Sequence, residues 1–314
     1  MKDIPLPKQP IPVILGTDWW SDCDDCMALR ILCWAHKKGY INLLGVCINA
    51  CMEYSVASVD AFLHLEGLSA LPIGLDADAT DFTGRGPYQQ SLAKLYSGRT
   101  NADAQDGVAL YRRLLSTADR PVHIVEIGFT QVLADLLDSA PDDFSPLNGK
   151  ELVREKCAKL WCMAGDWSTP DTGREHNFCN NARSRSGGKR LCEGWSSPIT
   201  FLGFEIGVDC ISGGLLQEDD FLHMALAAHG SAKGRCSWDP MLALLCVVND
   251  EERAGYSVKR GTASLDEETG VNRFALDAKG QHQFVCRQHA AGFYSDWINA
   301  ILTEDYHSFT NKHE

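Results

Sequence analysis

The chain has 314 residues, of which 45% are hydrophobic and 23% are charged, and these values are typical of a globular protein with a substantial core. Its net charge of −13 leaves no basic surface for a phosphate backbone, which argues against nucleic-acid binding. Neither a signal-peptide pattern nor an apolar run long enough to span a bilayer occurs, so we expect a soluble, cytoplasmic protein with no membrane partner. We expect a single domain over residues 1–314, because single α/β domains commonly reach this length.

Apolar runs alternate with helix-periodic segments along the first half of the chain. They predict strands at 12–18, 41–49, 71–75 and 121–128. They predict one helix that begins at Asp22 or Asp24 and ends near residue 36, and further helices at 54–66, 103–118 and 132–138. Residues 77–105 are polar and are expected to form a loop beside the functional site. This alternation is typical of an α/β fold with a mostly parallel central sheet and crossover helices.

The second half of the chain continues the pattern with less regularity. Strands are predicted at 158–165 and 199–204, a helix at 241–248, and a closing helix at 293–302. Short runs between 256 and 285 predict strands or a hairpin appended to the sheet. Residues 166–195 are interpreted as an irregular, solvated loop, because they carry a basic run of Arg183, Arg185, Lys189 and Arg190.

Thirteen cysteines occur at irregular spacing, and an odd number does not suit a closed disulfide framework. Cys23 and Cys26 form a C-x-x-C pattern, but both residues between them are acidic and would raise a thiol pKa. Free cysteines are among the most buried residues, so we interpret these two as packing residues in a reducing interior.

Four aspartates fall within eight positions directly after the first predicted strand: Asp18, Asp22, Asp24 and Asp25. Like charges held close repel and raise one another's pKa, and a bound cation relieves this repulsion. A helix cap needs only one or two acids, so the cluster favours a divalent-cation site over capping alone. Asp18, Asn49 and Asp76 each lie at the carboxyl end of a predicted strand, and ligands of parallel sheets bind beyond such ends.

Four segments, in order, resemble the inosine-uridine preferring nucleoside hydrolase family. Residues 16–25 are similar to the longer form of its aspartate turn, D-T-D-x-G-x-D-x-D-D, with Gly16 in place of the first aspartate and Trp20 in place of the glycine. Residues 127–131, Ile-Gly-Phe-Thr-Gln, resemble G-P-L-T-N. Residues 175–178, Glu-His-Asn-Phe, resemble E-F-N-x, and residues 238–240, Trp-Asp-Pro, resemble H-D-P.

The resemblance implies a Rossmann-like nucleoside hydrolase fold and calcium-dependent hydrolysis of the N-glycosidic bond of a ribonucleoside or a related N-ribosyl compound. Asp18, Asp25 and Asp239 would bind Ca²⁺, together with the main-chain carbonyl of Thr130 or Gln131, and such an oxygen set suits this hard cation. Asp18 would also accept the proton of the attacking water. The residues implied to contact the substrate are Asp24, Asn49, Glu175 and Asn177 at the ribose and Trp238 at the base.

Departures from the family pattern leave three questions open. Trp238 stands where pyrimidine-cleaving members have a histidine that protonates the departing base, and an indole cannot do so. The base could instead be activated by a proton from His176 or His229, or by stacking on Trp238, although a lone histidine is more often structural. Asp22 has three possible roles, as a metal ligand, a ribose contact or a helix cap. The base contacts are expected from variable loops, including 77–105 and 215–236.

Two rival functions follow. A catalytically weak or inactive protein of the same fold could keep the ribose and calcium contacts without turnover. A magnesium-dependent phosphotransferase of the haloacid-dehalogenase type is disfavoured, because its D-x-D turn requires a second aspartate where Trp20 stands. Members of the family are commonly dimers or tetramers, so we expect a homodimer or homotetramer that acts in purine or pyrimidine salvage.

Overall fold

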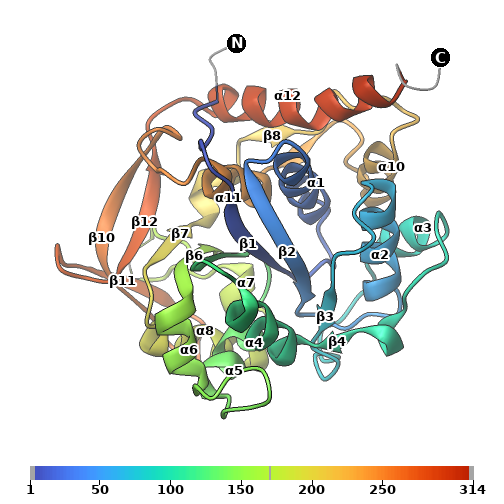
Figure 1. Ribbon diagram of the computed structural model, residues 1–314. Helices are drawn as coiled ribbons and strands as arrows, with labels where there is room; N and C mark the ends of the chain where they lie inside the picture. Colours follow the sequence, from blue (N-terminus) through green and yellow to red (C-terminus); the bar gives the residue numbers. More distant parts are fainter. Residues whose placement is uncertain (1–3, 170, 311–314) are drawn as a thin grey trace.

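The structure is a computed structural model that describes residues 4–169 and 171–310, so the first three residues of the leader lie outside the described residues. Its strands are β1 (Ile11–Thr17), β2 (Ile41–Ile48), β3 (Ile73–Leu75), β4 (Gln105–Asp106), β5 (Val122–Glu126), β6 (Cys157–Met163), β7 (Ile199–Leu202), β8 (Ile211–Ser212), β9 (Arg235–Cys236), β10 (Tyr256–Leu265), β11 (Asn272–Leu276) and β12 (His282–Arg287). Ten of them form one sheet in the order β11-β10-β12-β7-β6-β5-β1-β2-β3-β4 (Figure 1). The sheet is parallel from β4 to β12, and β10 pairs antiparallel with both β11 and β12.

Helices cover both faces of the sheet. Their bounds are α1 (Asp24–Lys37), α2 (Ser55–Leu65), α3 (Gln89–Ala93), η1 (Asn101–Asp103), α4 (Gly107–Thr117), α5 (Gln131–Asp138), α6 (Gly149–Lys156), α7 (His176–Cys179), α8 (Ala182–Gly194), α9 (Phe204–Gly207), α10 (Phe221–His229), α11 (Trp238–Val248) and α12 (Ala291–Thr310). Figure 1 shows α1, α11 and α12 on one side of the sheet and α4, α5, α6 and α8 on the other.

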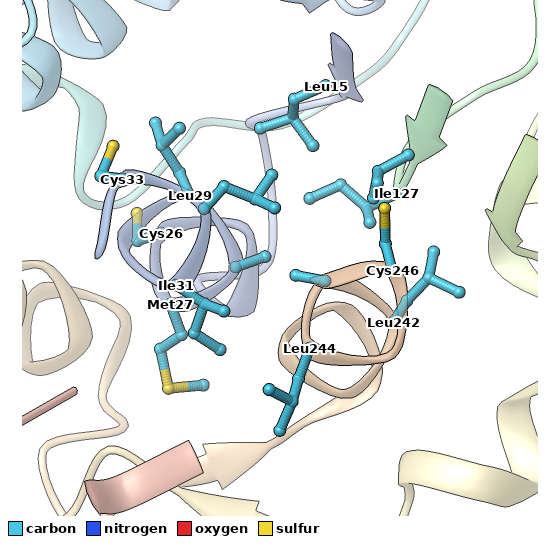
Figure 2. Packing of buried hydrophobic residues seen from close by; sticks show 14 of the residues in the cluster. Leu15, Cys26, Met27, Leu29, Ile31, Cys33, Ile127, Leu242, Leu244 and Cys246 are labelled. Atoms are coloured by element: carbon cyan, nitrogen blue, oxygen red, sulfur yellow. The ribbon is translucent and has the colours of Figure 1, made fainter. Parts of the chain in front are cut away.

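Each face of the sheet has its own hydrophobic core. Side chains alternate along a strand, so Val13 and Leu15 of β1 join the core under α1 and α11, while Ile14 joins the core under α4 and α5. Figure 2 shows α1 and α11 packed side by side, with Leu29 of α1 near Leu15 and Cys246 of α11 near Ile127. Burial on both faces explains why the strands are nearly continuous apolar runs.

The fold predicted from the sequence is confirmed, with its parallel central sheet, crossover helices and antiparallel strands near the C-terminus. The interpretation of residues 166–195 as an irregular loop is wrong, because α7 and α8 lie within it. Asn181 caps α8 by accepting the N–H of Ser184 at 2.9 Å, and Arg190 on this helix pairs with Asp135 (2.8 Å) and Asp138 (2.9 Å) of α5. Residues 77–105, predicted as a loop, also contain α3 and η1.

The cysteines are free thiols, and Cys23 and Cys26 are fully buried in the core that contains α1. Among residues 4–169 and 171–310, no helix combines the length and the apolar character that crossing a bilayer requires.

Candidate active site

The strand order reverses at the centre of the sheet. β1 pairs with β2 on one side and with β5 on the other. The chain therefore adds β2, β3 and β4 on one side of β1 and then crosses to add β5 on the other side. Ligands of open parallel sheets bind at such a reversal, beyond the carboxyl ends of the strands. Gly128 lets the segment after β5 approach the segment after β1, because a Cβ at this position would lie 2.2 Å from the backbone nitrogen of Asp18.

A cleft of about 260 Å³ opens at this point. Asn177, His176, Phe204, Arg235 and Trp238 form part of its wall. The wall also contains six carboxyl side chains: Asp18, Asp22, Asp24, Asp25, Glu175 and Asp239. The structure thus brings together predicted site residues that are up to 221 positions apart in the chain, between Asp18 and Asp239.

Three buried aspartates converge at the floor of the cleft. Carboxylate oxygens of Asp24, Asp25 and Asp239 all lie within 4.8 Å of one another. The first turn of α11 supplies Asp239, whose backbone N–H donates to Asp24 at 3.2 Å. Asp25 accepts the hydroxyl hydrogen of Thr17 and the backbone N–H of Trp19, the latter at 3.2 Å. These contacts hold the carboxylates in place, and no basic side chain takes part in them.

The turn that leads into this floor has an unusual backbone. Trp19 has a φ of +47°, in the left-handed region that side chains other than glycine rarely adopt. Its fully buried indole holds the conformation by packing edge-on against Phe62 and Tyr88, with ring centroids 5.4 and 5.7 Å away. In this conformation the backbone N–H of Trp20 donates to Asp18 at 3.1 Å. The buried tryptophan therefore orients the aspartate turn.

Burial and mutual repulsion act on the acids of the floor. Burial, reinforced by the charges of Asp22 and Asp24, raises the pKa of Asp18 to about 8. The pKa values of Asp24, Asp25 and Asp239 also lie well above their usual range, first because the groups are desolvated and then because their charges repel. A bound divalent cation would relieve both effects. The donor set consists of oxygens alone, which fits Ca²⁺ or Mg²⁺ and not a thiolate-bound metal.

Glu175 and Asn177 occupy fixed positions on another part of the wall. The carboxylate of Glu175 caps α7 by accepting the N–H of Asn177 at 2.8 Å, and its second oxygen accepts the N–H of Gly165 at 3.0 Å. The amide of Asn177 donates to the carbonyls of Met163 (2.9 Å) and Ile127 (3.2 Å), at the ends of β6 and β5. Burial raises the pKa of Glu175 to about 7. The two polar side chains are thus preorganised for a ligand with hydroxyl groups.

Asp22 forms an ion pair with Arg235 of β9. The guanidinium Nη2 lies 2.5 Å from Asp22 Oδ2 and its Nε lies 2.8 Å from Asp22 Oδ1. The N-cap residue of α1 is Cys23, so the helix-cap alternative for Asp22 is not observed. His229 Nε2 lies 3.9 Å from Asp22 Oδ1, and its Nδ1 contacts the hydroxyl of Ser231 at 2.9 Å, outside the wall of the cleft.

Three predicted residues lie in a buried network beside the cleft instead of on its wall. The side chain of Asn49 donates to Glu126 at 2.8 Å and accepts the N–H of Phe129 at 2.9 Å. Gln131 donates to the carbonyl of Asn49 at 2.6 Å. Thr130 is fully buried, and its hydroxyl has no hydrogen-bond partner among the described residues. The predicted roles of Asn49, Thr130 and Gln131 stay predictions.

Glu126 is a buried acid that the sequence motifs do not single out. Its Oε1 accepts from Asn49 and from the N–H of Gly128, and burial raises its pKa to about 8. A Cβ at Gly16 would lie 2.1 Å from Glu126 Oε2, so this carboxyl needs the glycine beside it. Gly16 stands where the resembling family has an aspartate, and here a carboxyl from β5 fills that space. An acid within the apolar run 122–127 is the signal that could have revealed it.

Aromatic side chains stand at the open end of the cleft. The rings of Phe204 and Trp238 are stacked at 5.5 Å and 24°, and Trp238 Nε1 donates to the carbonyl of Phe204 at 2.6 Å. The guanidinium of Arg235 lies 5.5 Å from the centre of the Trp238 ring. His176 stacks on Trp20 with centroids 6.0 Å apart. Phe204 carries no sequence signal, and Arg235 belongs to the segment 215–236 that was expected to contact the base but was not singled out within it.

A larger hollow of about 980 Å³ lies beside Lys159 of β6 and Pro198, which directly precedes β7. Lys159 pairs there with Glu251, which also accepts the hydroxyl hydrogen of Thr200 at 2.9 Å. Its principal charges therefore compensate one another, whereas Asp24, Asp25 and Asp239 of the smaller cleft form no salt bridge among the described residues. We take the smaller cleft as the candidate active site.

No protein-family model matches the chain, and no curated protein sequence matches it. Solved structures do. A plant nucleoside hydrolase, the PpNRh1 enzyme, superposes with a TM-score of 0.71 at 12% identity, over 94% of this chain and 99% of that one. The inosine-uridine preferring nucleoside hydrolase from Bacillus anthracis gives 0.66 at 14% identity, over 93% and 98%. The type III effector protein XopQ, complexed with adenosine diphosphate ribose, gives 0.66 at 15% identity, over 94% and 93%. The chain therefore has the nucleoside hydrolase fold, as the resemblance in its sequence implied.

Proposed function

We propose that this protein hydrolyses the N-glycosidic bond of a ribonucleoside or a related N-ribosyl compound in a calcium-dependent reaction. The observation that carries the proposal is the set of buried carboxylates of Asp24, Asp25 and Asp239, whose oxygens lie within 4.8 Å of one another. None of the three forms a salt bridge with a basic side chain among the described residues. So many uncompensated buried acids are rare without a cation. The nucleoside hydrolase fold of the chain supports the reaction class.

Asp25 and Asp239 of this group are the proposed carboxylate ligands of Ca²⁺, together with Asp18 on the wall of the cleft, while Asp24 of the group is assigned to the ribose. A main-chain carbonyl of Thr130 or Gln131 is the proposed further ligand. When bound, the calcium ion supplies positive charge that acidifies and orients a nearby water. The carboxylate of Asp18 accepts the proton of that water. Its position at the carboxyl end of β1 directs it into the cleft.

The ribose is held by polar side chains that the protein has already oriented. Glu175 is fixed by two backbone N–H groups, and Asn177 by two carbonyls, so neither loses much rotamer freedom when it binds a hydroxyl. Asp24 and Asn49 are proposed further ribose contacts. Positive charge develops on the ribose as the glycosidic bond breaks, and carboxylates such as Glu175 stabilise it.

The leaving base is proposed to stack on Trp238. The proposed setting is a cytoplasmic homodimer or homotetramer that recovers bases for salvage.

A second candidate function is a ribosyl-binding protein without turnover. It is favoured by one observation: the indole N–H of Trp238 is already donated to the carbonyl of Phe204, so this side chain cannot protonate a departing base. The likeness to XopQ complexed with adenosine diphosphate ribose makes such a ligand a reasonable probe of binding.

Asp18→Asn tests the proposal directly. With Ca²⁺ present, the wild-type chain is expected to release base from at least one member of a panel of nucleosides, and the variant to lose at least about 100-fold in kcat because it removes the proton acceptor. Asp138→Asn, an exposed acid paired with Arg190, is the matched control and should keep wild-type turnover. Full turnover in Asp18→Asn would contradict the assignment. Ligand-induced stabilisation without base release by the wild-type chain would support the binding protein instead.

A further inference from the structure

Acidic groups outnumber basic groups on the wall of the cleft. Six carboxyl side chains and one guanidinium, that of Arg235, line it among the described residues. A bound divalent cation carries two positive charges and Arg235 carries one, and together they offset three of the six carboxylate charges. The cleft with its cation bound therefore remains negative when all six carboxyl groups are ionised. In a cleft of low dielectric, this surplus favours a bound compound that carries positive charge.

Arg235 does not reverse this preference. Both oxygens of Asp22 face its guanidinium, at 2.5 and 2.8 Å, so its charge is locally neutralised. It is therefore poorly placed to repel a cationic ligand.

The aromatic pair at the mouth of the cleft suits the same kind of ligand. Phe204 is 43% exposed, whereas Glu175 and Asn177 are 4% and 5% exposed. Because Phe204 lies nearer the surface than Glu175 and Asn177, the aromatic rings would contact the part of the substrate that lies away from the ribose. Aromatic faces attract cations, and Arg235 beside the ring of Trp238 is one instance within this site.

Away from the acids of the floor, few groups on this wall could protonate a departing base. Trp238 donates its one N–H to a backbone carbonyl, and both oxygens of Glu175 accept backbone N–H groups. His176 contributes the only imidazole among the described wall residues, and desolvation lowers its pKa, which disfavours the protonated ring. A leaving group that is already cationic needs no proton, because it becomes neutral when it takes the bonding electrons.

We infer, on the basis of the proposed function, that the preferred substrates are N-ribosyl compounds with a cationic heteroaromatic leaving group, as in an N-ribosylpyridinium. The bond between ribose C1′ and the ring nitrogen breaks, and both of its electrons pass to that nitrogen. The oxygen of water forms the new bond to C1′, and the water proton passes to the carboxylate of Asp18. The products are ribose, a neutral heteroaromatic base and one proton, which Asp18 releases to solvent.

Non-hydrolysable C-ribosides separate recognition of charge from reactivity of the leaving group. Calorimetric titration of the calcium-loaded protein would compare 3-ribosylpyridine with its N-methylpyridinium form. The cation should bind about 10-fold more tightly. Phe204→Leu should reduce that ratio to about 3-fold, whereas Phe144→Leu, at an exposed position outside the cleft, should keep the wild-type ratio. Nicotinamide riboside should be hydrolysed with a kcat/KM about 100-fold above that of uridine or inosine.

The outcomes separate this inference from the proposed function. Equal affinity for the two C-ribosides would overturn the inference and leave the proposed function standing. Hydrolysis of uridine or inosine at least as efficient as that of nicotinamide riboside would also overturn it, while supporting the function. Failure of the loaded protein to release a base from any N-ribosyl compound would overturn the proposed function itself.

Discussion

Asp239 shows how one residue links the stability of the molecule to its proposed metal. Its carboxylate lies close to those of Asp24 and Asp25, and all three are desolvated. Repulsion among them costs free energy in the metal-free fold, and a cation that binds only the folded chain regains it. Ligand binding of this kind stabilises by about 3 kcal/mol when the ligand is at 100 times its dissociation constant.

Removal of calcium with a chelator is therefore expected to lower the Tm of the wild-type chain, and added Ca²⁺ to restore it. Asp239→Asn should respond less to Ca²⁺ because it lacks one ligand. The same variant should have a higher Tm than wild type when both are metal-free, because one repelling charge is gone. Thermal unfolding with and without Ca²⁺ measures both effects, with Asp138→Asn as the surface control. A lower metal-free Tm for Asp239→Asn, or an unchanged calcium response, would count against the metal site.

Single residues of the site differ in how far the sequence could reveal them. Asp18, Asp24 and Asp25 are crowded into eight positions, so their charge alone marks them. Glu175 and Asn177 required a family pattern, because each is ordinary in isolation. Phe204 could not be predicted, and Arg235 was covered only by the expectation that the segment 215–236 contacts the base, since only the folded chain brings the two side chains beside the aspartate turn.

Among the elements, α8 shows why a helix can be hidden in its sequence. It contains Gly187 and Gly188, which as a pair indicate a turn. In the fold, a Cβ at Gly187 would lie 2.7 Å from the backbone of Gln131, and one at Gly188 would lie 2.8 Å from the ring of Phe178. Close packing against α5 and α7 therefore requires the glycines, and tertiary contact outweighs their low helix propensity. By contrast, β1, β2 and β5 could be predicted, because strands buried on both faces are continuous apolar runs.

Strand β5 also carries a titratable group that should make stability depend on pH. His123 accepts the indole N–H of Trp161 at 3.2 Å and is 9% exposed. Burial, with the nearby charge of Lys159, lowers its pKa from 6.5 to about 4. The unfolded chain therefore binds a proton at this histidine between pH 6.5 and 4 while the folded chain does not. Stability contributed by the neutral ring is present above pH 6.5 and is lost as the pH falls toward 4.

His123→Gln should remove this dependence, because glutamine can still accept the indole N–H but does not titrate. Between pH 7 and pH 4.5 the wild-type chain should lose about 2–3 kcal/mol of unfolding free energy more than the variant does. Urea unfolding of both chains at each pH measures the difference. His64→Gln, at an exposed position of α2, should follow the wild-type curve. Parallel curves for wild type and His123→Gln would contradict the assigned pKa.

For the whole molecule, the sequence predicted the class of the sheet but not its order. Alternating strands and helices indicate parallel pairing, yet the position of β5 beside β1 depends on contacts such as that of Val13 with His123, which are 110 residues apart. That position creates the cleft, because it places Asp18 beside Gly128 at the reversal of strand order. The aspartates were therefore visible as a charged cluster, while Glu175, Asn177 and Asp239 were assigned to the same site only through the family resemblance.

One buried ionic group joins three elements around the site. Arg30 of α1 pairs with Glu66 after α2 at 2.8 Å, and with both oxygens of Asp220 before α10 at 2.6 and 2.9 Å. All three residues are at most 7% exposed. Asp220 also caps α10 by accepting the N–H of Leu222 at 2.8 Å. The loss of Arg30 would leave the buried carboxylate of Asp220 without a counter-charge, and that of Glu66 with Lys37 alone, 2.7 Å away.

Arg30→Met is therefore expected to destabilise the fold by about 3–5 kcal/mol, because unpaired buried charges are costly whereas well-packed apolar replacements are not. The triple variant Arg30→Met, Glu66→Gln, Asp220→Asn should regain most of that loss, since asparagine still caps α10 and no buried charge remains. Lys189→Ala, which breaks an exposed pair with Glu193, should cost less than about 1 kcal/mol. Denaturant unfolding of the four chains measures these differences. If the triple variant were as unstable as Arg30→Met, packing of the arginine and not its charge would be what joins the three elements.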